Sequence, residues 1–247
     1  KLLIKKWVEQ GAKYEDHWAY ITPKKEVLPE VTNQDWAKDN PIDRFVAAQF
    51  EKAGLSPSPQ EKPARLYRRL YFDLIGLPPT PQELEVLLAD QRDFDIVYRE
   101  TVDKLLKTDA YAEQWSRHWL DVARYADTHG IHIDNYRSIW PYRDWVVEAF
   151  NSGLPYRDFL LHQLAGDVLA NDVEDSADLR LATAFNRLHR MTNEGGSVEE
   201  EWRHGYAVDR VETFGTAVLG LTLGCARCHD HKFDPITQSE FYGFVGF

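Results

Sequence analysis

The 247-residue sequence predicts a mainly α-helical protein: an irregular multi-helix domain with long connections. Apolar residues recur at the three- and four-residue spacing of amphipathic helices through most of the chain. Alternation of Val, Ile and Thr over strand lengths is nearly absent. Gly, Pro, Ser and Thr stand where the periodic segments begin and end, as helix caps and stops do. No internal repeat is visible.

Two helices separated by a long connector are expected in the first quarter of the chain. The stretch "KLLIKKWVEQGA" has one apolar face and ends at Gly11. A polar, proline-punctuated stretch then runs to about Pro41, and we interpret residues 21–41 as a linker because so long a loop is unusual inside a domain. The second helix, "IDRFVAAQFEKAGL", ends at Gly54.

Eight more helices are expected downstream. In the first connection, Thr80, Pro81 and Glu83 have the identities of an N-cap, a first helical residue and a capping-box partner. Ser197 and Glu200 have the same spacing ahead of the last helix. The non-periodic "HGIHIDNYRSIW" is expected to be a loop. The eight segments are "ARLYRRLYFDLIGL", "PQELEVLLAD", "FDIVYRETVDKLLKT", "AYAEQWSRHWLDVARYADT", "PYRDWVVEAFNSGL", "YRDFLLHQLAGDVL", "DLRLATAFNRLHR" and "VEEEWRHGYAVDRVETFGTAVLGLTL".

The charge disfavours two classes of partner. The formal net charge is −11, from 40 acidic and 29 basic residues, and the basic residues form no stripe, so we expect no nucleic-acid binding. No apolar run reaches the roughly 18 residues that a membrane span needs. "NEGGS" lacks the further glycines and the Lys-Ser/Thr pair of a phosphate-binding loop, so nucleotide binding is not supported either.

The only two cysteines stand three residues apart in "GCARCHDHKFDP". Thiols at this spacing reach the two vinyl groups of one porphyrin, and the adjacent His229 can give its imidazole to the iron. Cys225, Cys228 and His229 therefore predict one covalent haem c per chain, with His229 as the proximal ligand. Zinc held by both cysteines, His231 and a distant fourth ligand is an alternative, as are a redox pair, a local disulfide and buried thiols.

The same region resembles the second planctomycete-type cytochrome C domain family, which occurs in large extracytoplasmic proteins of environmental bacteria. The stretch "GLTLGCARCHDHKFDPITQSEFY" resembles the signature near the end of that domain. Upstream stretches match the same pattern in order: "PIDRFVAAQFEKAGLSPSP", "RRLYFDLIGLPPTPQELEVLLAD", "AEQWSRHWLDVARYADTHG", "SIWPYRDWVVEAFNSGLPYRDFLLHQLAGDVL" and "FNRLHRMTNEGGSVEEEWR".

The resemblance implies a domain organisation and a setting. Residues 42–247 would form the helical cytochrome domain, truncated at its C-terminal end, and residues 1–20 would be the last helix of a preceding small cytochrome c domain. Further domains would follow, and the protein would be periplasmic or otherwise extracytoplasmic. That cytochrome c domain, or another electron carrier, is the expected partner.

The second axial position of the iron separates an electron carrier from a catalyst. Met191, the only methionine, would raise the potential as a ligand, but it also suits a gap in the core. His118 lies between Trp115 and Trp119 and is a candidate distal ligand or pocket acid or base. A helix histidine bonded to a carboxylate is an equal alternative for it, and His189 is a weaker candidate.

Polar side chains that follow His118 complete the predicted distal pocket. We assign catalytic roles to His118 and to Arg124, Tyr125 and Asp127. Arginine binds carboxylates bidentately, so Arg210 is assigned to a haem propionate. Internal salt bridges are the alternative for each of these residues.

The remaining histidines near the site have other expected roles. His129 and His132 flank a loop glycine and are expected in a surface segment. His231 is too close to His229 to reach the opposite face of the same ring.

Three functions follow from these assignments. The first is the haem domain of an extracytoplasmic oxidoreductase that exchanges electrons with a neighbouring cytochrome c domain. The second is an electron-transfer module without a substrate. The third is a binding or scaffold domain stapled by a metal or a disulfide.

Overall fold

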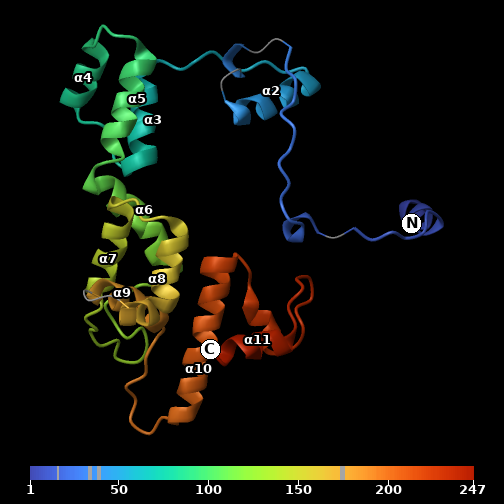
Figure 1. Cartoon of the computed structure of the whole chain (residues 1–247), viewed down its shortest axis with the longest axis vertical. Helices are drawn as coiled ribbons and strands as arrows, with labels where there is room; N and C mark the ends of the chain where they lie inside the picture. The colour runs from blue at the N-terminus through green and yellow to red at the C-terminus, as the bar shows by residue number, and fades with distance from the viewer. Residues whose placement is uncertain (16, 33–34, 38–39, 173–175) are drawn as a thin grey trace. The chain divides into compact units, whose positions relative to one another are not determined.

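The computed structural model describes residues 1–247 except 16, 33–34, 38–39 and 173–175. Its described part contains eleven α-helices and no β-strand, apart from one isolated bridge between Thr128 and Tyr136, which confirms the predicted fold class (Figure 1). Within the same part, no helix combines the length and the hydrophobicity that a bilayer crossing requires. The chain divides into two compact units, Lys1–Gln60 and Glu61–Phe247.

The first unit contains two helices, α1 (Leu2–Glu9) and α2 (Pro41–Ala53), and the short 3₁₀ turns Trp18–Tyr20 and Asp35–Ala37. The Asn40 side chain accepts a hydrogen bond from the Ile42 amide at the start of α2, and Gly54 ends that helix in the left-handed conformation.

The second unit begins with three helices, α3 (Pro63–Ile75), α4 (Pro81–Ala89) and α5 (Phe94–Leu105). Thr80 and Glu83 form the predicted capping box of α4. Five buried side chains hold the group together: Tyr67, Leu70, Tyr71, Val97 and Leu105.

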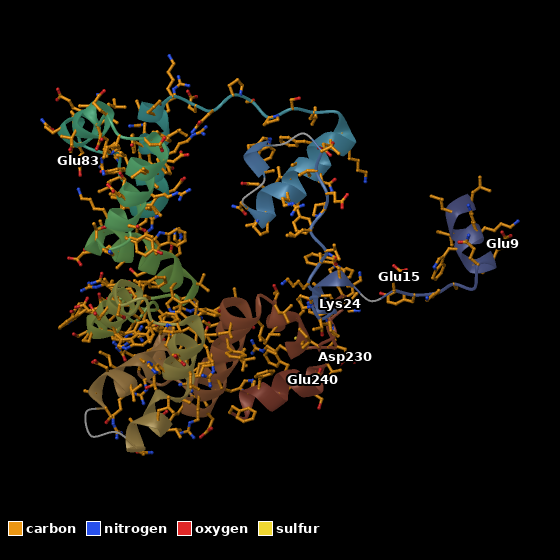
Figure 2. The ribbon with its side chains drawn as sticks, turned by 45° about the horizontal axis from the view of Figure 1, so that its top comes forward. Glu9, Glu15, Lys24, Glu83, Asp230 and Glu240 are labelled. Atoms are coloured by element: carbon orange, nitrogen blue, oxygen red, sulfur yellow. The ribbon has the colours of Figure 1, made fainter. Side chains whose placement is uncertain are left out.

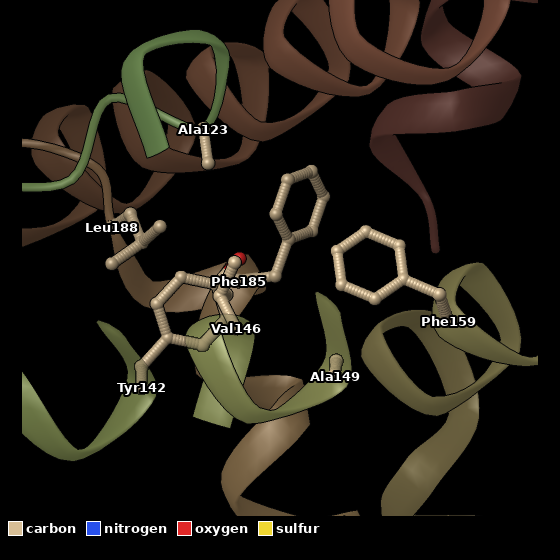
Figure 3. Close-up of a cluster of buried hydrophobic side chains, with 7 residues drawn as sticks. All are labelled: Ala123, Tyr142, Val146, Ala149, Phe159, Phe185 and Leu188. Atoms are coloured by element: carbon tan, nitrogen blue, oxygen red, sulfur yellow. The ribbon is translucent and has the colours of Figure 1, made fainter. Parts of the chain in front are cut away.

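The main core lies among α6 (Asp109–Val122), α7 (Trp140–Asn151), α8 (Tyr156–Leu169) and α9 (Ala177–Ala182). The indole of Trp119 donates hydrogen bonds to the hydroxyl of Tyr142 and to Oε1 of Gln163, which satisfies these buried polar groups. Figure 3 shows the apolar cluster: Ala123, Tyr142, Val146, Ala149, Phe159, Phe185 and Leu188.

The C-terminal part of this unit consists of α10 (Glu199–Phe214), a π turn (Gly215–Leu219), a 3₁₀ helix (Leu223–Arg227) and α11 (Gln238–Val245). Phe241 of α11 is fully buried against α10 and the 3₁₀ helix. The other buried members of this cluster are Val208, Val211, Leu223 and Ala226. The cysteine motif is therefore part of a small core of its own.

Four expectations about the helices were wrong. The helix expected to run to Thr128 ends at Val122, and Arg124 has the left-handed conformation. The segment from Asp178 is α-helical only to Ala182 and continues as a 3₁₀ helix to Arg187. The last long helix changes to a π turn after Phe214. Ser197 does not cap it, because its hydroxyl donates to the Glu194 carbonyl and Val198 is the N-cap.

Candidate functional site

The 3₁₀ helix Leu223–Arg227 presents the two cysteines on one face. Residues three apart eclipse each other along a 3₁₀ helix. Leu223 and Ala226 are buried in the core, whereas Cys225 and Cys228, the latter at the C-cap, are both exposed. The three-residue spacing thus places Leu223 and Ala226 together in the core and both thiols together at the surface.

Two glycines allow this turn to lie close to α10. A Cβ atom on Gly215 would stand 2.4 Å from Cγ of Leu223, and one on Gly224 would stand 2.9 Å from Oε1 of Glu212. A larger residue at Gly215 would displace Leu223 from the core, whereas one at Gly224 would require the flexible Glu212 side chain to move, so the apolar anchor depends mainly on Gly215.

The imidazole of His229 is exposed and oriented by its own loop. Its Nδ1 lies 2.7 Å from the carbonyl oxygen of Asp230, and because a carbonyl only accepts, Nδ1 carries the proton of the neutral ring. The lone pair of Nε2 is then available to a metal, in the arrangement common for metal-binding histidines.

His231 has the opposite tautomer. Its Nδ1 accepts hydrogen bonds from the amides of Asp234, at 2.8 Å, and Phe233, at 3.3 Å, so the ring proton is on Nε2. A neutral His231 therefore uses its lone pair to shape the loop. It would have to lose these bonds to act as the third zinc ligand considered above.

Helix α11 fixes the loop that follows the motif. Figure 2 labels Asp230 in this loop and Glu240 in α11. The Asp230 carboxylate accepts a hydrogen bond of 2.8 Å from the Gln238 amide, and the Arg227 carbonyl accepts from the Gln238 and Tyr242 side chains. Thr237 and Glu240 form a complete capping box at the start of α11. Sequence reasoning missed this helix, although "TQSE" has the capping-box spacing that indicates it.

The donor set at the motif is small. The two thiols are free, with no disulfide between them. Within the described ranges, no three His, Cys, Asp or Glu side chains gather closely enough to hold a metal ion. The metal-capable groups at this surface are thus the thiol pair and Nε2 of His229.

The predicted catalytic residues belong to two polar networks and one separate helix face. Arg124 forms an ion pair with Asp209 of α10. The Tyr125 hydroxyl donates to Oδ2 of Asp127 at 2.5 Å, and burial together with this carboxylate raises the pKa of Tyr125. His118 is exposed on α6, edge-on to the Trp115 ring, and no contact among the described residues joins it to either network.

Arg210 contacts a buried histidine. Its guanidinium donates to Nε2 of His189 at 3.1 Å, while Nδ1 of His189 donates to the Arg190 carbonyl at 3.0 Å. The His189 ring stacks on Tyr206, with centroids 4.4 Å apart. Burial lowers the pKa of His189, the bond to the Arg190 carbonyl raises it, and the charge of Arg210 lowers it.

The half-buried Met191 and the histidine loop lie together. The Met191 amide donates to the His129 carbonyl at 2.9 Å, and His132 forms an ion pair of 2.8 Å with Glu194. The segment around Met191 therefore packs on the irregular loop after α6.

His189 makes the folded domain sensitive to acid. The unfolded chain protonates this imidazole below about pH 6.5, whereas the folded chain, with its lowered pKa, keeps it neutral to lower pH. The stability that it contributes is fully present above that pH and is lost as the pH falls through the folded pKa. Urea unfolding between pH 7 and 5 should show a smaller pH slope in His189→Gln than in the wild type. A slope in His189→Gln equal to that of the wild type would contradict the prediction.

A cavity of about 200 Å³, lined by charged and aromatic residues, lies between the motif and α10. Arg227, inside the cysteine pair, lines it together with Arg190, and α10 supplies Trp202, Tyr206, Asp209 and Glu212. Nothing in the residue pattern marked this grouping, because its members are spread over 38 positions that come together only through the packing of the turn on α10.

Of the comparisons with known proteins, one gives a match. No curated protein and no solved structure matches the chain. A family model does match, over residues 41–247: PSCyt2, described as "Protein of unknown function (DUF1549)". The match includes α2, every helix of the second unit and the cysteine motif. Since it covers most of the sequence, the chain belongs to the PSCyt2 family.

Proposed function

We propose that the chain binds one haem c through thioethers at Cys225 and Cys228, with His229 as the proximal ligand. The observation that carries the proposal is the outward face of the 3₁₀ turn, where both thiols are exposed at a three-residue spacing. The imidazole that follows has its Nε2 lone pair free. Two exposed thiols followed by an imidazole with a free Nε2 are the donor types that a c-type haem requires, which supports the proposal.

The haem would supply one-electron exchange at this surface. The chain's own contribution is to hold the donors: the Asp230 carbonyl fixes the His229 ring and makes Nε2 more basic. Arg210 uses one guanidinium nitrogen on His189, and we assign its remaining N–H groups to a propionate.

We further propose that the chain is the haem domain of an extracytoplasmic oxidoreductase. The cavity at Arg227 supports a substrate over simple electron carriage, since it brings charged and aromatic side chains beside the motif. Residues 1–20 would belong to a preceding cytochrome c domain that relays electrons, residues 21–41 would be a linker, and further domains would follow residue 247.

The experiment is an absorption spectrum of the full chain, made with c-type haem maturation outside the cytoplasm, together with a haem stain of the denatured protein. A stain that survives denaturation and the haemochrome spectrum of a two-thioether haem are expected. Binding of carbon monoxide would support an oxidoreductase, and inert six-coordinate iron would favour the electron-transfer module. A colourless protein would overturn both and leave the stapled scaffold.

A further inference from the structure

The cavity beside the motif has a lining whose charges are only partly paired. Arg190 and Arg227 have exposed side chains, and neither forms an ion pair within the described part of the chain. Glu212 is half-buried, and it too forms no ion pair within the described part of the chain. In contrast, Asp209 already pairs with Arg124 through Oδ1. The unpaired lining therefore carries two positive charges and one negative charge.

One acceptor in this lining lacks a donor. The Oδ2 atom of Asp209 is buried and has no hydrogen-bond partner among the described residues. A buried carboxylate oxygen without a donor is costly. Because this atom is closed to solvent, the groups open to a ligand in the cavity are the two guanidinium groups and the Glu212 carboxylate.

A glycine keeps the α10 side of the cavity open. Gly205 lies in the middle of α10, where glycine costs about 1 kcal/mol relative to alanine. A Cβ atom there would meet nothing within 4 Å, so packing does not require the glycine. Since Gly205 lines the cavity, a side chain at this position would occupy it.

We infer that this cavity binds a small organic anion with one carboxylate and at least one hydroxyl group. Arg190 and Arg227 would take the carboxylate, because guanidinium groups bind carboxylates bidentately. The Glu212 carboxylate would accept a hydrogen bond from the hydroxyl group. A single negative charge neutralises the unpaired lining, whereas phosphate brings nearly two charges at neutral pH and would face both carboxylates.

The aromatic side chains limit the size and shape of this ligand. Trp202 and Tyr206 stand one helical turn apart on α10, with ring centroids 5.9 Å apart, and supply the apolar part of the lining. A volume of about 200 Å³ holds a molecule of a few carbon atoms. Binding of this ligand does not depend on the haem. The inference rests on the proposed function in one respect: with the proposed haem attached, the bound hydroxy acid would be its substrate.

Isothermal titration calorimetry on the full chain tests the inference with four probes: glycerate, acetate, glycerol and inorganic phosphate. Glycerate should bind at least tenfold more tightly than the other three. Gly205→Leu should weaken glycerate binding at least tenfold, and Arg227→Gln should do the same, while Arg157→Gln on the exposed face of α8 should not. Gly243→Leu is the matched control for the glycine, since Gly243 also lies in a helix with open space at its Cβ.

The outcomes separate the site from the haem. Thermal unfolding should show that Gly205→Leu is at least as stable as the wild type, so weakened binding cannot come from misfolding. Glycerate binding should persist in the C225S/C228S double variant, so failure of haem attachment leaves this result intact. Absence of glycerate binding, preference for phosphate, or undiminished binding in Gly205→Leu would each overturn the inference.

Discussion

Replacement of both cysteines in a C225S/C228S variant is expected to abolish covalently bound haem completely. Serine has nearly the same size but cannot form the thioether bonds. Both side chains are exposed, and Leu223 and Ala226, which anchor the turn, are untouched. The stain of the denatured chain should therefore disappear, while the far-ultraviolet circular dichroism stays that of the wild type.

Single variants sharpen this result. Cys225→Ser and Cys228→Ser should each keep one thioether, so the stain should survive with a shifted haemochrome band. His229→Ala should retain the full stain, because both thioethers remain, but change the visible spectrum through loss of the axial imidazole. A stain that persists at wild-type strength in the double variant would show that haem, if present, is attached elsewhere.

The second large effect is expected in the main core, away from the motif. Substitution of Gly166 by alanine should destabilise the domain by about 3 kcal/mol. A Cβ atom at this buried position would stand 2.1 Å from the Leu179 carbonyl oxygen and 2.9 Å from its carbon. Backbone atoms cannot rotate away as a side chain can, so α8 and α9 would have to separate.

Urea unfolding followed by circular dichroism measures this effect as a lower midpoint at an unchanged slope. Gly243→Ala in α11 is the matched control, and it should be neutral or slightly stabilising because its Cβ meets no neighbour. Equal midpoints for Gly166→Ala and the wild type would show that α8 and α9 are not held in this close approach.

The local signals in the sequence were sufficient for most of the helices. Thr80 with Glu83, and Gly54 after α2, act through bonds within a few residues, so their roles could be read without knowledge of the fold. The same reasoning failed at Ser197. Its hydroxyl donates a hydrogen bond to the Glu194 carbonyl and does not cap the amides at the start of α10. Two local bonds of similar strength competed there, and spacing alone does not decide between them.

The candidate site was predictable only where its parts are neighbours in sequence. Cys225, Cys228 and His229 form one motif, and the prediction that they bind haem awaits the spectrum. The pairing of Arg124 with Asp209 joins α6 to α10 over 85 positions, and no periodicity encodes such a contact. His118 lies on the exposed face of α6, whereas the other predicted pocket residues follow the end of that helix at Val122, so the expected helix did not bring them together.

The outward position of the thiols also bears on how the mature protein would be made. An attachment enzyme needs access to both sulfur atoms, and here the folded domain already offers them at its surface. Ligation could therefore follow folding and need not take place on the nascent chain. The same accessibility has a cost under the proposed function: in an oxidising compartment, two exposed thiols without haem would be open to disulfide formation, so haem attachment would require that the pair be kept reduced.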